Sequence, residues 1–224
     1  MFDQLIIGDK CSCDDFGASV CLRNIKDPKK KKITKTVPFS NATYDFTKIN
    51  GEIYWEQREL EYVFEMIASS PEELEEMKIA FSNFVMNVMD AEIYDPFIPD
   101  YHFIGTYESK SYDDDESLLK TTATVVFLAY PYKVANSPKK YNKTIPGGGN
   151  VTINVDNNSS HRITPTIKVN GKARIVYGNG SYAYSDTEIT SGVFALEIGA
   201  NSFYVENYGV SECTIEISFR EEVF

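Results

Sequence analysis

The sequence has little of the chemistry that enzymes and cofactor sites use. Its 224 residues include two histidines, His102 and His161, four cysteines and one tryptophan, Trp55. Neither histidine stands in a catalytic motif, and no Gly-x-Ser-x-Gly elbow is present. Gly147-Gly148-Gly149 lacks the Lys and Ser/Thr that complete a phosphate-binding loop. We therefore expect neither an enzyme nor a bound cofactor.

Metal, disulfide and membrane motifs are equally scarce. Cys11-Ser12-Cys13 does not have zinc-finger spacing, and the contiguous run from Asp113 to Glu116 lacks the spaced ligands of a calcium loop. No apolar run approaches the roughly 18 residues of a membrane span. Met1 to Gly8 does not resemble a signal peptide. We expect a cytosolic protein with free thiols, no metal and no membrane insertion.

The charge is negative and unevenly distributed. The net charge is -11, with 14 basic and 24 acidic residues in 1–133, against 8 and 9 in the remainder. Such acidity argues against wrapping of nucleic acid. One lysine run opposes it, and we interpret it as a solvated loop or hairpin tip, or as a contact for an acidic partner. In the second case Lys29 and Lys30 would meet Asp113 and Asp114 of a neighbouring copy. The lysines of the run are Lys26, Lys29, Lys30, Lys31, Lys32 and Lys35.

A strand followed by a capped helix is the clearest structural pattern. From Arg58 to Met66 apolar and acidic residues alternate, as in a half-buried strand, with Val63 as the exception. Ser70-Pro71-Glu72-Glu73 then has the residues of a capping box, with proline at the first helical position. Apolar residues continue at steps of three and four. The pattern predicts a helix over residues 70–90 that packs on a sheet.

A long hairpin is predicted over residues 101–130. Tyr101 to Tyr107 alternates as one strand, Thr121 to Tyr130 forms the other, and Glu108 to Lys120 reads as a polar, mobile tip. Such a ribbon can pair with a neighbouring copy, and the same side chains can instead line the subunit's own core. The candidate interface residues are Tyr101, Phe103, Tyr107, Val125 and Phe127.

The remainder of the chain predicts a second β domain. Residues 134–150 are rich in Asn, Ser, Pro and Lys and end in Pro146-Gly147-Gly148-Gly149, which predicts a linker. Seven short strand patterns follow in 151–224, with turns such as Asn170-Gly171. They favour a β-sandwich without a helix. We thus predict a mainly β protein with domains at 1–133 and 151–224.

The order of these features resembles the distal tail (Dit) protein family of phages. The resemblance rests on Tyr44-Asp45-Phe46, Gly51-Glu52-Ile53-Tyr54, the strand ending at Met66 and the Ser70 helix, and more weakly on Asn157 to Ile167 and Leu196 to Asn201. It implies an N-terminal β-sandwich with one helix and a belt hairpin, and a galectin-like C-terminal β-sandwich.

The resemblance also implies a role in the virion. The family's proteins form a hexameric ring at the tail tip of phages of Gram-positive bacteria, assembled in the host cytoplasm. The ring joins the tail tube protein to the tail-associated hub protein, provides a platform for receptor-binding or baseplate proteins, and lets DNA pass without specific binding. The belt hairpin, assigned here to 101–130, reaches the adjacent subunit.

A carbohydrate-binding adhesion module is the alternative function. Galectin-like folds can bind sugars on an aromatic platform with a few polar groups. Tyr182 and Tyr184 are the candidate glycan-binding residues, although Tyr is equally common in sandwich strands and at protein interfaces.

Overall fold

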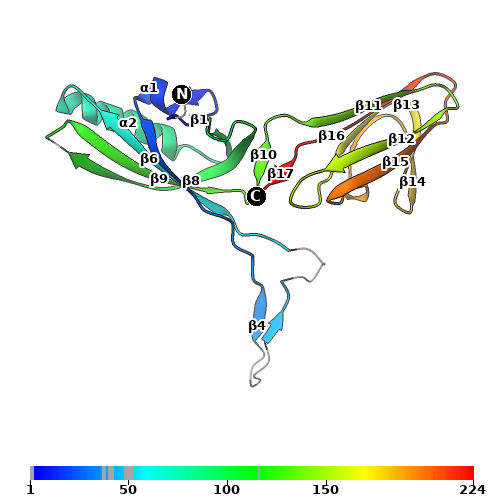
Figure 1. Ribbon diagram of the computed structural model, residues 1–224, viewed down its shortest axis with the longest axis horizontal. Coiled ribbons are helices and arrows are strands. Elements are labelled where there is room, and N and C mark those ends of the chain that lie inside the picture. Colours follow the sequence, from blue (N-terminus) through cyan, green and yellow to red (C-terminus); the bar gives the residue numbers. More distant parts are fainter. Residues whose placement is uncertain (1–2, 37–38, 40–42, 48–52, 116) are drawn as a thin grey trace. The chain divides into compact units, whose positions relative to one another are not determined.

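The computed structural model describes residues 3–36, 39, 43–47, 53–115 and 117–224. The predicted mainly β fold class is confirmed, and the strands fall into two compact units. Unit 1 comprises residues 1–133 and Phe224, and unit 2 comprises residues 134–223 (Figure 1). Gly51, Glu52 and Glu116, which entered the sequence interpretation, lie outside the described residues.

Unit 1 is built on one sheet with the strand order β2-β1-β7-β8-β9-β6-β3. All of its neighbouring strands are antiparallel. Strand β8 pairs with β7 through Phe103–Gly105 on one edge and with β9 from Gly105 onward on the other, so Gly105 has a partner on both sides. The strands are β1 (Ile6–Ile7), β2 (Lys10–Cys11), β3 (Ser19–Ile25), β6 (Arg58–Ile67), β7 (Ala91–Tyr94), β8 (Tyr101–Asp115) and β9 (Lys120–Ala129).

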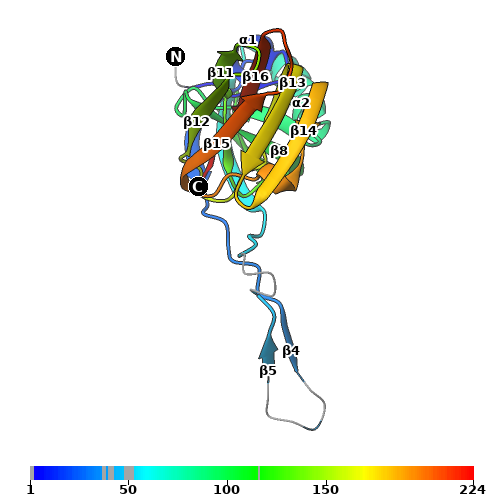
Figure 2. The ribbon, with the colours of Figure 1, turned by 90° about the vertical axis from the view of Figure 1, so that its right-hand side faces the viewer.

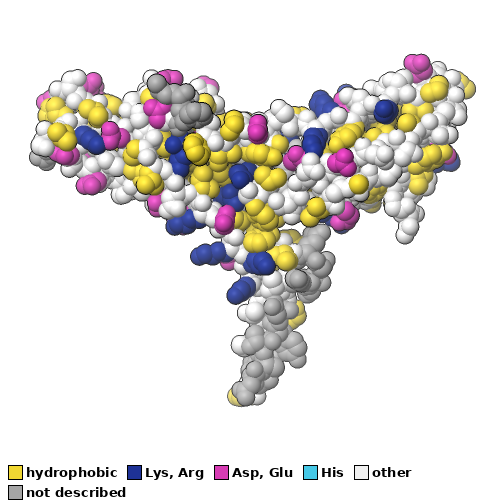
Figure 3. Space-filling model, viewed as in Figure 1, with side chains coloured by type: hydrophobic (Ala, Val, Ile, Leu, Met, Phe, Trp, Pro, Cys, Tyr) yellow, Lys and Arg dark blue, Asp and Glu magenta, His cyan; other side chains and the backbone are white. Residues whose placement is uncertain are grey.

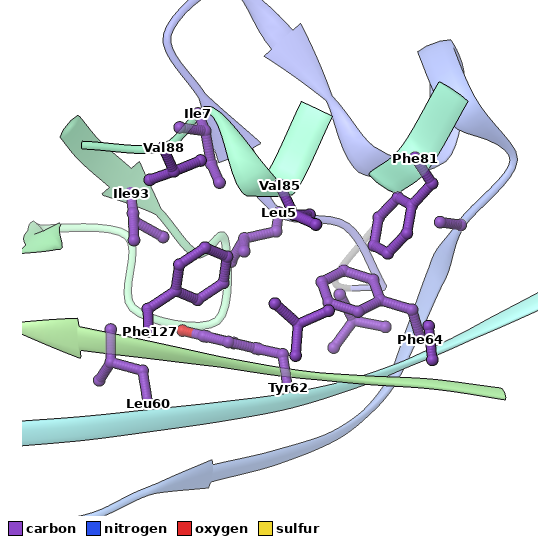
Figure 4. Close-up of a cluster of buried hydrophobic side chains, with 14 of the residues drawn as sticks. Leu5, Ile7, Leu60, Tyr62, Phe64, Phe81, Val85, Val88, Ile93 and Phe127 are labelled. Carbon is purple, nitrogen blue, oxygen red and sulfur yellow. The ribbon is translucent and has the colours of Figure 1, made fainter. Parts of the chain in front are cut away.

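The core of unit 1 follows the predicted alternation of β6. Leu60, Tyr62, Phe64 and Met66 are buried, while Val63 lies on the opposite face between the glutamates. Helix α2 (Pro71–Met86) covers the buried face. Figure 4 shows the resulting cluster, in which side chains from β6, β9, α2 and the segment near β1 point toward one another. Burial of these large side chains is the main stabilising term of the unit.

Helix α2 begins as predicted and ends earlier. The Ser70 side chain accepts a hydrogen bond from Glu73 N at 3.2 Å, and Glu73 accepts one from Ser69 N at 2.6 Å, one residue before the expected partner. The bond from Ser69 is the main reason that the pKa of Glu73 is lowered. The helix ends at Met86, where the Asn87 amide donates to Asn83 O.

A second, short helix was not predicted. Helix α1 (Ser12–Phe16) ends at Gly17, whose φ of 63° is left-handed and suits glycine. Phe16 stacks on Phe84 of α2 with 4.5 Å between ring centroids. Five residues are too few for a periodic apolar pattern to be visible in the sequence.

The hairpin of β8 and β9 lies where it was predicted, but its first strand is longer than expected. Strand β8 continues to Asp115, and each residue from Ser109 to Asp115 has a partner on β9. Most of the segment expected as a loop-like tip, Ser109 to Asp115 and Lys120, therefore belongs to the strands, and residues 117–119 form a turn. The acidic residues enter the strand because they lie at the exposed end of the sheet, where water solvates them.

A separate two-stranded ribbon lies between β3 and β6 in the sequence. Within the described part of the chain, strands β4 (Thr34–Thr36) and β5 (Thr43–Asp45) pair with each other and with no other strand. Figure 2 shows the two strands side by side, and the described segments 26–33 and 53–57 lie between them and the main sheet in the sequence. Backbone hydrogen bonds from Lys31 N to Tyr54 O and from Glu56 N to Lys29 O continue the pairing between those segments. The ribbon region is defined here as the described residues between Lys29 and Glu56, namely 29–36, 39, 43–47 and 53–56.

Unit 2 is a six-stranded sheet folded into two layers. Its path is β11-β16-β13-β15-β12, and β14 pairs with β13. Strand β13 pairs with β16 through its first residues and with β15 through its last, so the two halves belong to opposite layers around one core. The strands are β11 (Lys139–Ile145), β12 (Asn150–Asn157), β13 (Thr166–Tyr177), β14 (Gly180–Thr190), β15 (Gly199–Asn207) and β16 (Cys213–Phe219).

The predicted linker at 134–150 is wrong. Residues 139–145 form β11 in the sheet of unit 2, and β10 (Lys133–Ala135) pairs with β17 (Glu222–Val223). The segment has the polar composition of a linker because β11 is an edge strand with one face in water. Of its residues, Tyr141 and Ile145 pack toward the core.

The change of layer in β13 depends on Gly171. A bulge interrupts the register between Val169 and Lys172, and Gly171 adopts φ of 98°. Its amide donates to Asp186 Oδ1 at 2.6 Å, and Asp186 itself has φ of 43°. A Cβ at position 171 would lie 3.1 Å from Cys213 Cα. The bend thus combines a left-handed conformation with a close backbone approach.

Gly171→Ala is expected to destabilise unit 2 by about 1–3 kcal/mol, because it adds both backbone strain and a steric contact. The free energy of unfolding in urea measures the effect. Gly192→Ala is the control, since no atom lies within 4 Å of the Cβ position there. Equal stability of the two variants would contradict the role given to Gly171.

Three asparagines with at most 8% exposure, Asn157, Asn201 and Asn207, hold the loops of unit 2. The Asn207 amide donates to the carbonyl oxygens of Ile145, Pro146 and Ser211, and its side-chain oxygen accepts from Gly209 N. Buried backbone groups that leave the sheets need such partners. The loop at the end of β15 is thus held by a single side chain.

Candidate functional site

The hairpin residues predicted as an interface lie largely in the core of unit 1. Phe103, Val125 and Phe127 are at most 1% exposed and belong to the hydrophobic cluster around β6. Tyr107 also packs against this cluster, and Tyr101 is half-buried. These residues are buried because the hairpin pairs with β6 and β7 on its two edges and is covered by α2.

The acidic end of the hairpin is tied to α2. Asp114 accepts from Lys78 Nζ at 2.9 Å and from Thr121 Oγ1 at 2.6 Å, and these bonds lower the pKa of Asp114, with Thr121 as the larger cause. Lys78 and Lys110 lie over the Tyr112 ring at 5.3 and 5.1 Å from its centroid. Asp114 is therefore engaged within its own unit, whereas the Asp113 side chain is exposed.

The ribbon region is the exposed, weakly supported part of unit 1. An isolated two-stranded ribbon is marginally stable in water, and its open edges can pair with another chain. Lys29 and Lys31 are exposed, as are Ile33 and Tyr54. Figure 3 shows Lys and Arg side chains gathered along the described part of this region. The ribbon combines positive charge with exposed apolar side chains, as protein interfaces often do.

Aromatic side chains support the base of the ribbon. The Lys30 ammonium lies 5.7 Å from the centroid of the Trp55 ring, and the two residues form an isolated β-bridge. Trp55 in turn contacts Phe224 at 4.6 Å, and Phe224 contacts Tyr132 at 4.9 Å, both between ring centroids. Lys30, a predicted interface residue, therefore contacts Trp55 within unit 1, while both Lys29 and Lys30 are exposed.

A buried ion pair joins β3 to the residue that follows β7 and was not predicted. Arg23 Nε donates to Asp95 at 2.8 and 3.1 Å, and the Asp95 side chain is fully buried. Asp95 also accepts from Phe97 N at 3.0 Å. Burial, with a smaller contribution from Asp95, raises the pKa of Tyr62. The partners are 72 residues apart, and no sequence spacing could have paired them.

The predicted sugar-binding tyrosines face inward. Tyr182 and Tyr184 make edge contacts with Phe194 at 5.2 and 6.1 Å between centroids and pack against the core of unit 2. Tyr182 also borders an open hollow of about 740 Å³ with Arg162 and Glu197. The rings support the fold there and do not form an exposed stacking platform.

Residues of the kinds used in catalysis do not converge. His102 is buried beside Tyr94, and His161 lies 3.1 Å from Glu222. Within the described residues no group of three or more His, Cys, Asp or Glu side chains is placed to hold a metal ion. None of the described helices has the length and apolar character needed to cross a membrane.

The chain has the fold of a Dit protein. The chain superposes on the crystal structure of SPP1 Dit (gp19.1), presented as a paradigm of the hub adsorption apparatus in phages that infect Gram-positive bacteria. The TM-score is 0.67 at 12% identity, with 97% of this chain and 98% of that chain covered. At this identity the likeness establishes the fold.

Weaker likenesses are found to baseplate structures. A chain of the phage p2 baseplate in its activated conformation with Sr gives a TM-score of 0.42 at 10% identity, covering 96% of this chain and 97% of that chain. A chain of the baseplate in its activated conformation with Ca gives a TM-score of 0.38 at 8% identity, covering 96% of this chain and 97% of that chain. These TM-scores are too low to establish a shared fold. No protein-family model and no curated protein sequence matches the chain.

Proposed function

We propose that this chain is a structural protein of a phage tail tip that forms a hexameric ring between the tail tube and the tail-associated hub protein. The observation that carries the proposal is the full-length likeness to SPP1 Dit, which includes both units. The receptor-binding or baseplate proteins would dock on the ring's periphery. The ring would be assembled in the cytoplasm of a Gram-positive host and reside in the virion tail tip.

Ring closure requires a head-to-tail interface, in which different surfaces of two copies meet. The ribbon region supports such an interface, because it is exposed and its strands pair with nothing else among the described residues. We assign to it the contact with the adjacent subunit that the sequence had suggested for residues 101–130. Exposed Asp113 remains a candidate partner for its lysines.

The acidity of unit 1 is compatible with a DNA channel. On β6 the outward face carries Glu59, Glu61 and Glu65, alternating with the buried core residues. Lys26 and Lys120 pair with the first and last of these glutamates. Negative charge on a ring's inner wall repels phosphates, so DNA would pass without binding.

Electron microscopy of the purified full chain tests this function. The proposal requires closed rings with six-fold symmetry and an open channel in class averages. Rings with another symmetry, or open filaments, would contradict the hexamer and leave only the fold.

A charge reversal tests the ribbon directly. Lys29→Glu, Lys31→Glu and Lys32→Glu combined are expected to weaken ring assembly about tenfold or more, because like charges would then oppose each other across the interface. Analytical ultracentrifugation over a range of protein and salt concentrations measures the change. The matched control reverses Lys140, Lys143 and Lys168, an equal charge change on unit 2. Equal assembly of both variants would exclude the ribbon lysines.

A further inference from the structure

A polar hollow lies on the outer face of unit 2, over β11, β16 and the first half of β13. Its volume is about 500 Å³, within the range of small-molecule sites. Figure 2 shows the three strands side by side, and their pairing is continuous. Its lining includes no ribbon residue and neither Tyr182 nor Tyr184, so it is not the interface or the sugar platform considered above.

The strand register places the lining side chains in rows. Asn142, Glu216 and Lys168 are directly opposite one another on β11, β16 and β13. The next row holds Thr214 and Asn170, whose amide donates to the threonine hydroxyl at 3.1 Å. The register thus fixes the positions of these amide, hydroxyl and Lys168 side chains on one face, while Lys143, opposite the buried Ile215, has the other parity on the edge strand β11 and lines the hollow from its rim.

The hollow is positively charged within an acidic protein. Lys140, Lys143 and Lys168 line it and are exposed, against one acid, Glu216, which lies 3.7 Å from Lys140. Glu188 stands opposite Lys168 on β14 but does not line the hollow. The lining thus carries an excess of positive charge, with hydrogen-bonding groups between the lysines.

The same lining excludes several ligand classes. It contains no aromatic ring, and its apolar member, Ile215, is 1% exposed. A neutral sugar or an unpaired nucleic acid would lack a stacking surface, and a protein partner would lack an apolar centre. A ligand with many hydroxyls and regularly spaced negative charges fits, since hydroxyls bond to Asn and Thr and anions pair with Lys.

We propose that this hollow binds an acidic saccharide, meaning a short oligosaccharide segment that carries carboxylate or phosphate groups. Lys140, Lys143 and Lys168 would hold its anions, and Asn142, Asn170 and Thr214 its hydroxyls. The site is distinct from the tyrosine platform suggested by the sequence. It would give the outer face of unit 2 a recognition role in addition to the structural one.

Titration calorimetry of the full chain with trigalacturonate, which carries carboxylates, tests the proposal. Binding is expected to weaken by about fivefold between 0.05 and 0.5 M salt, because exposed ion pairs are screened. Combined Lys140→Ala, Lys143→Ala and Lys168→Ala should reduce affinity by about tenfold or more, at about two- to fivefold per lysine. A phosphate-bearing oligosaccharide tests the other anion. The matched control, Arg162→Ala, Lys172→Ala and Arg174→Ala, removes three exposed cations of the same unit that do not line the hollow, and it should bind within about twofold of the parent.

Any of the following outcomes would overturn the proposal. Absence of binding by both anionic oligosaccharides would remove it. Equal affinity for a neutral trigalactose would show that charge is not recognised. Tighter binding of an oligo-dT strand or a poly-Glu peptide would point to nucleic acid or protein instead, and equal losses in the two triple variants would indicate general attraction of anions.

Discussion

Asn207→Asp is expected to destabilise unit 2 by at least about 3 kcal/mol at neutral pH. The substitution removes the NH₂ group that donates to three carbonyl oxygens and places a carboxylate against them. A buried charge without a partner typically costs about 3–5 kcal/mol. For a unit of this size the melting temperature should fall by at least about 12 °C.

Differential scanning calorimetry measures this change, and Asn179→Asp is the matched control. Asn179 is exposed in the turn between β13 and β14, so the same chemical change should shift the melting temperature little. A stable Asn207→Asp variant would mean that the loop relaxes or admits water, and that one side chain does not hold it.

Asp95→Ala is expected to cost unit 1 about 3–5 kcal/mol, because it leaves the Arg23 guanidinium without its buried carboxylate. It also removes the acceptor for Phe97 N and so frees the turn after β7. The free energy of unfolding in urea, followed by circular dichroism, measures the loss.

A double variant tests whether the stability lost in Asp95→Ala comes from the charge of Arg23 or from altered packing. Arg23→Met with Asp95→Leu should recover most of the lost stability, because apolar residues of similar volume often replace a buried pair at little cost. The exposed Asp100→Ala is the control and should change stability by less than about 0.5 kcal/mol. If Asp95→Ala behaved like Asp100→Ala, the pair would not stabilise the unit.

Local patterns in the sequence predicted the elements that depend on local physics. The alternation of Leu60, Tyr62, Phe64 and Met66 gave the buried face of β6, because strand side chains have a period of two. Ser70 and Glu73 marked the start of α2, because capping involves residues only three apart.

Long-range relationships could not be predicted in the same way. In the sequence, the hydrophobic hairpin residues Phe103 and Phe127 suited an interface or a core equally well. Their burial follows from the pairing of the hairpin with β6 and β7, which no local pattern shows. Strand β11 looked like a linker because half of an edge strand is polar. The pairing of Arg23 with Asp95 depends on the whole sheet being formed.

The ribbon was visible in the sequence mainly through its charge. Its lysines suggested a solvated hairpin tip, which agrees with their exposure. Its independence from the main sheet is a property of strand pairing and has no local sequence pattern. The interface assignment consequently moves from residues 101–130 to the ribbon region and remains a prediction.

Native mass spectrometry of the full chain tests the central proposal most directly. Six copies of 25.4 kDa should give a closed assembly of about 152 kDa. The ribbon variant with Lys29, Lys31 and Lys32 replaced by Glu should appear mainly as monomer at the same concentration. A two-fold dimer, or a hexamer unaffected by the ribbon substitutions while the rest of the fold is intact, would contradict the account.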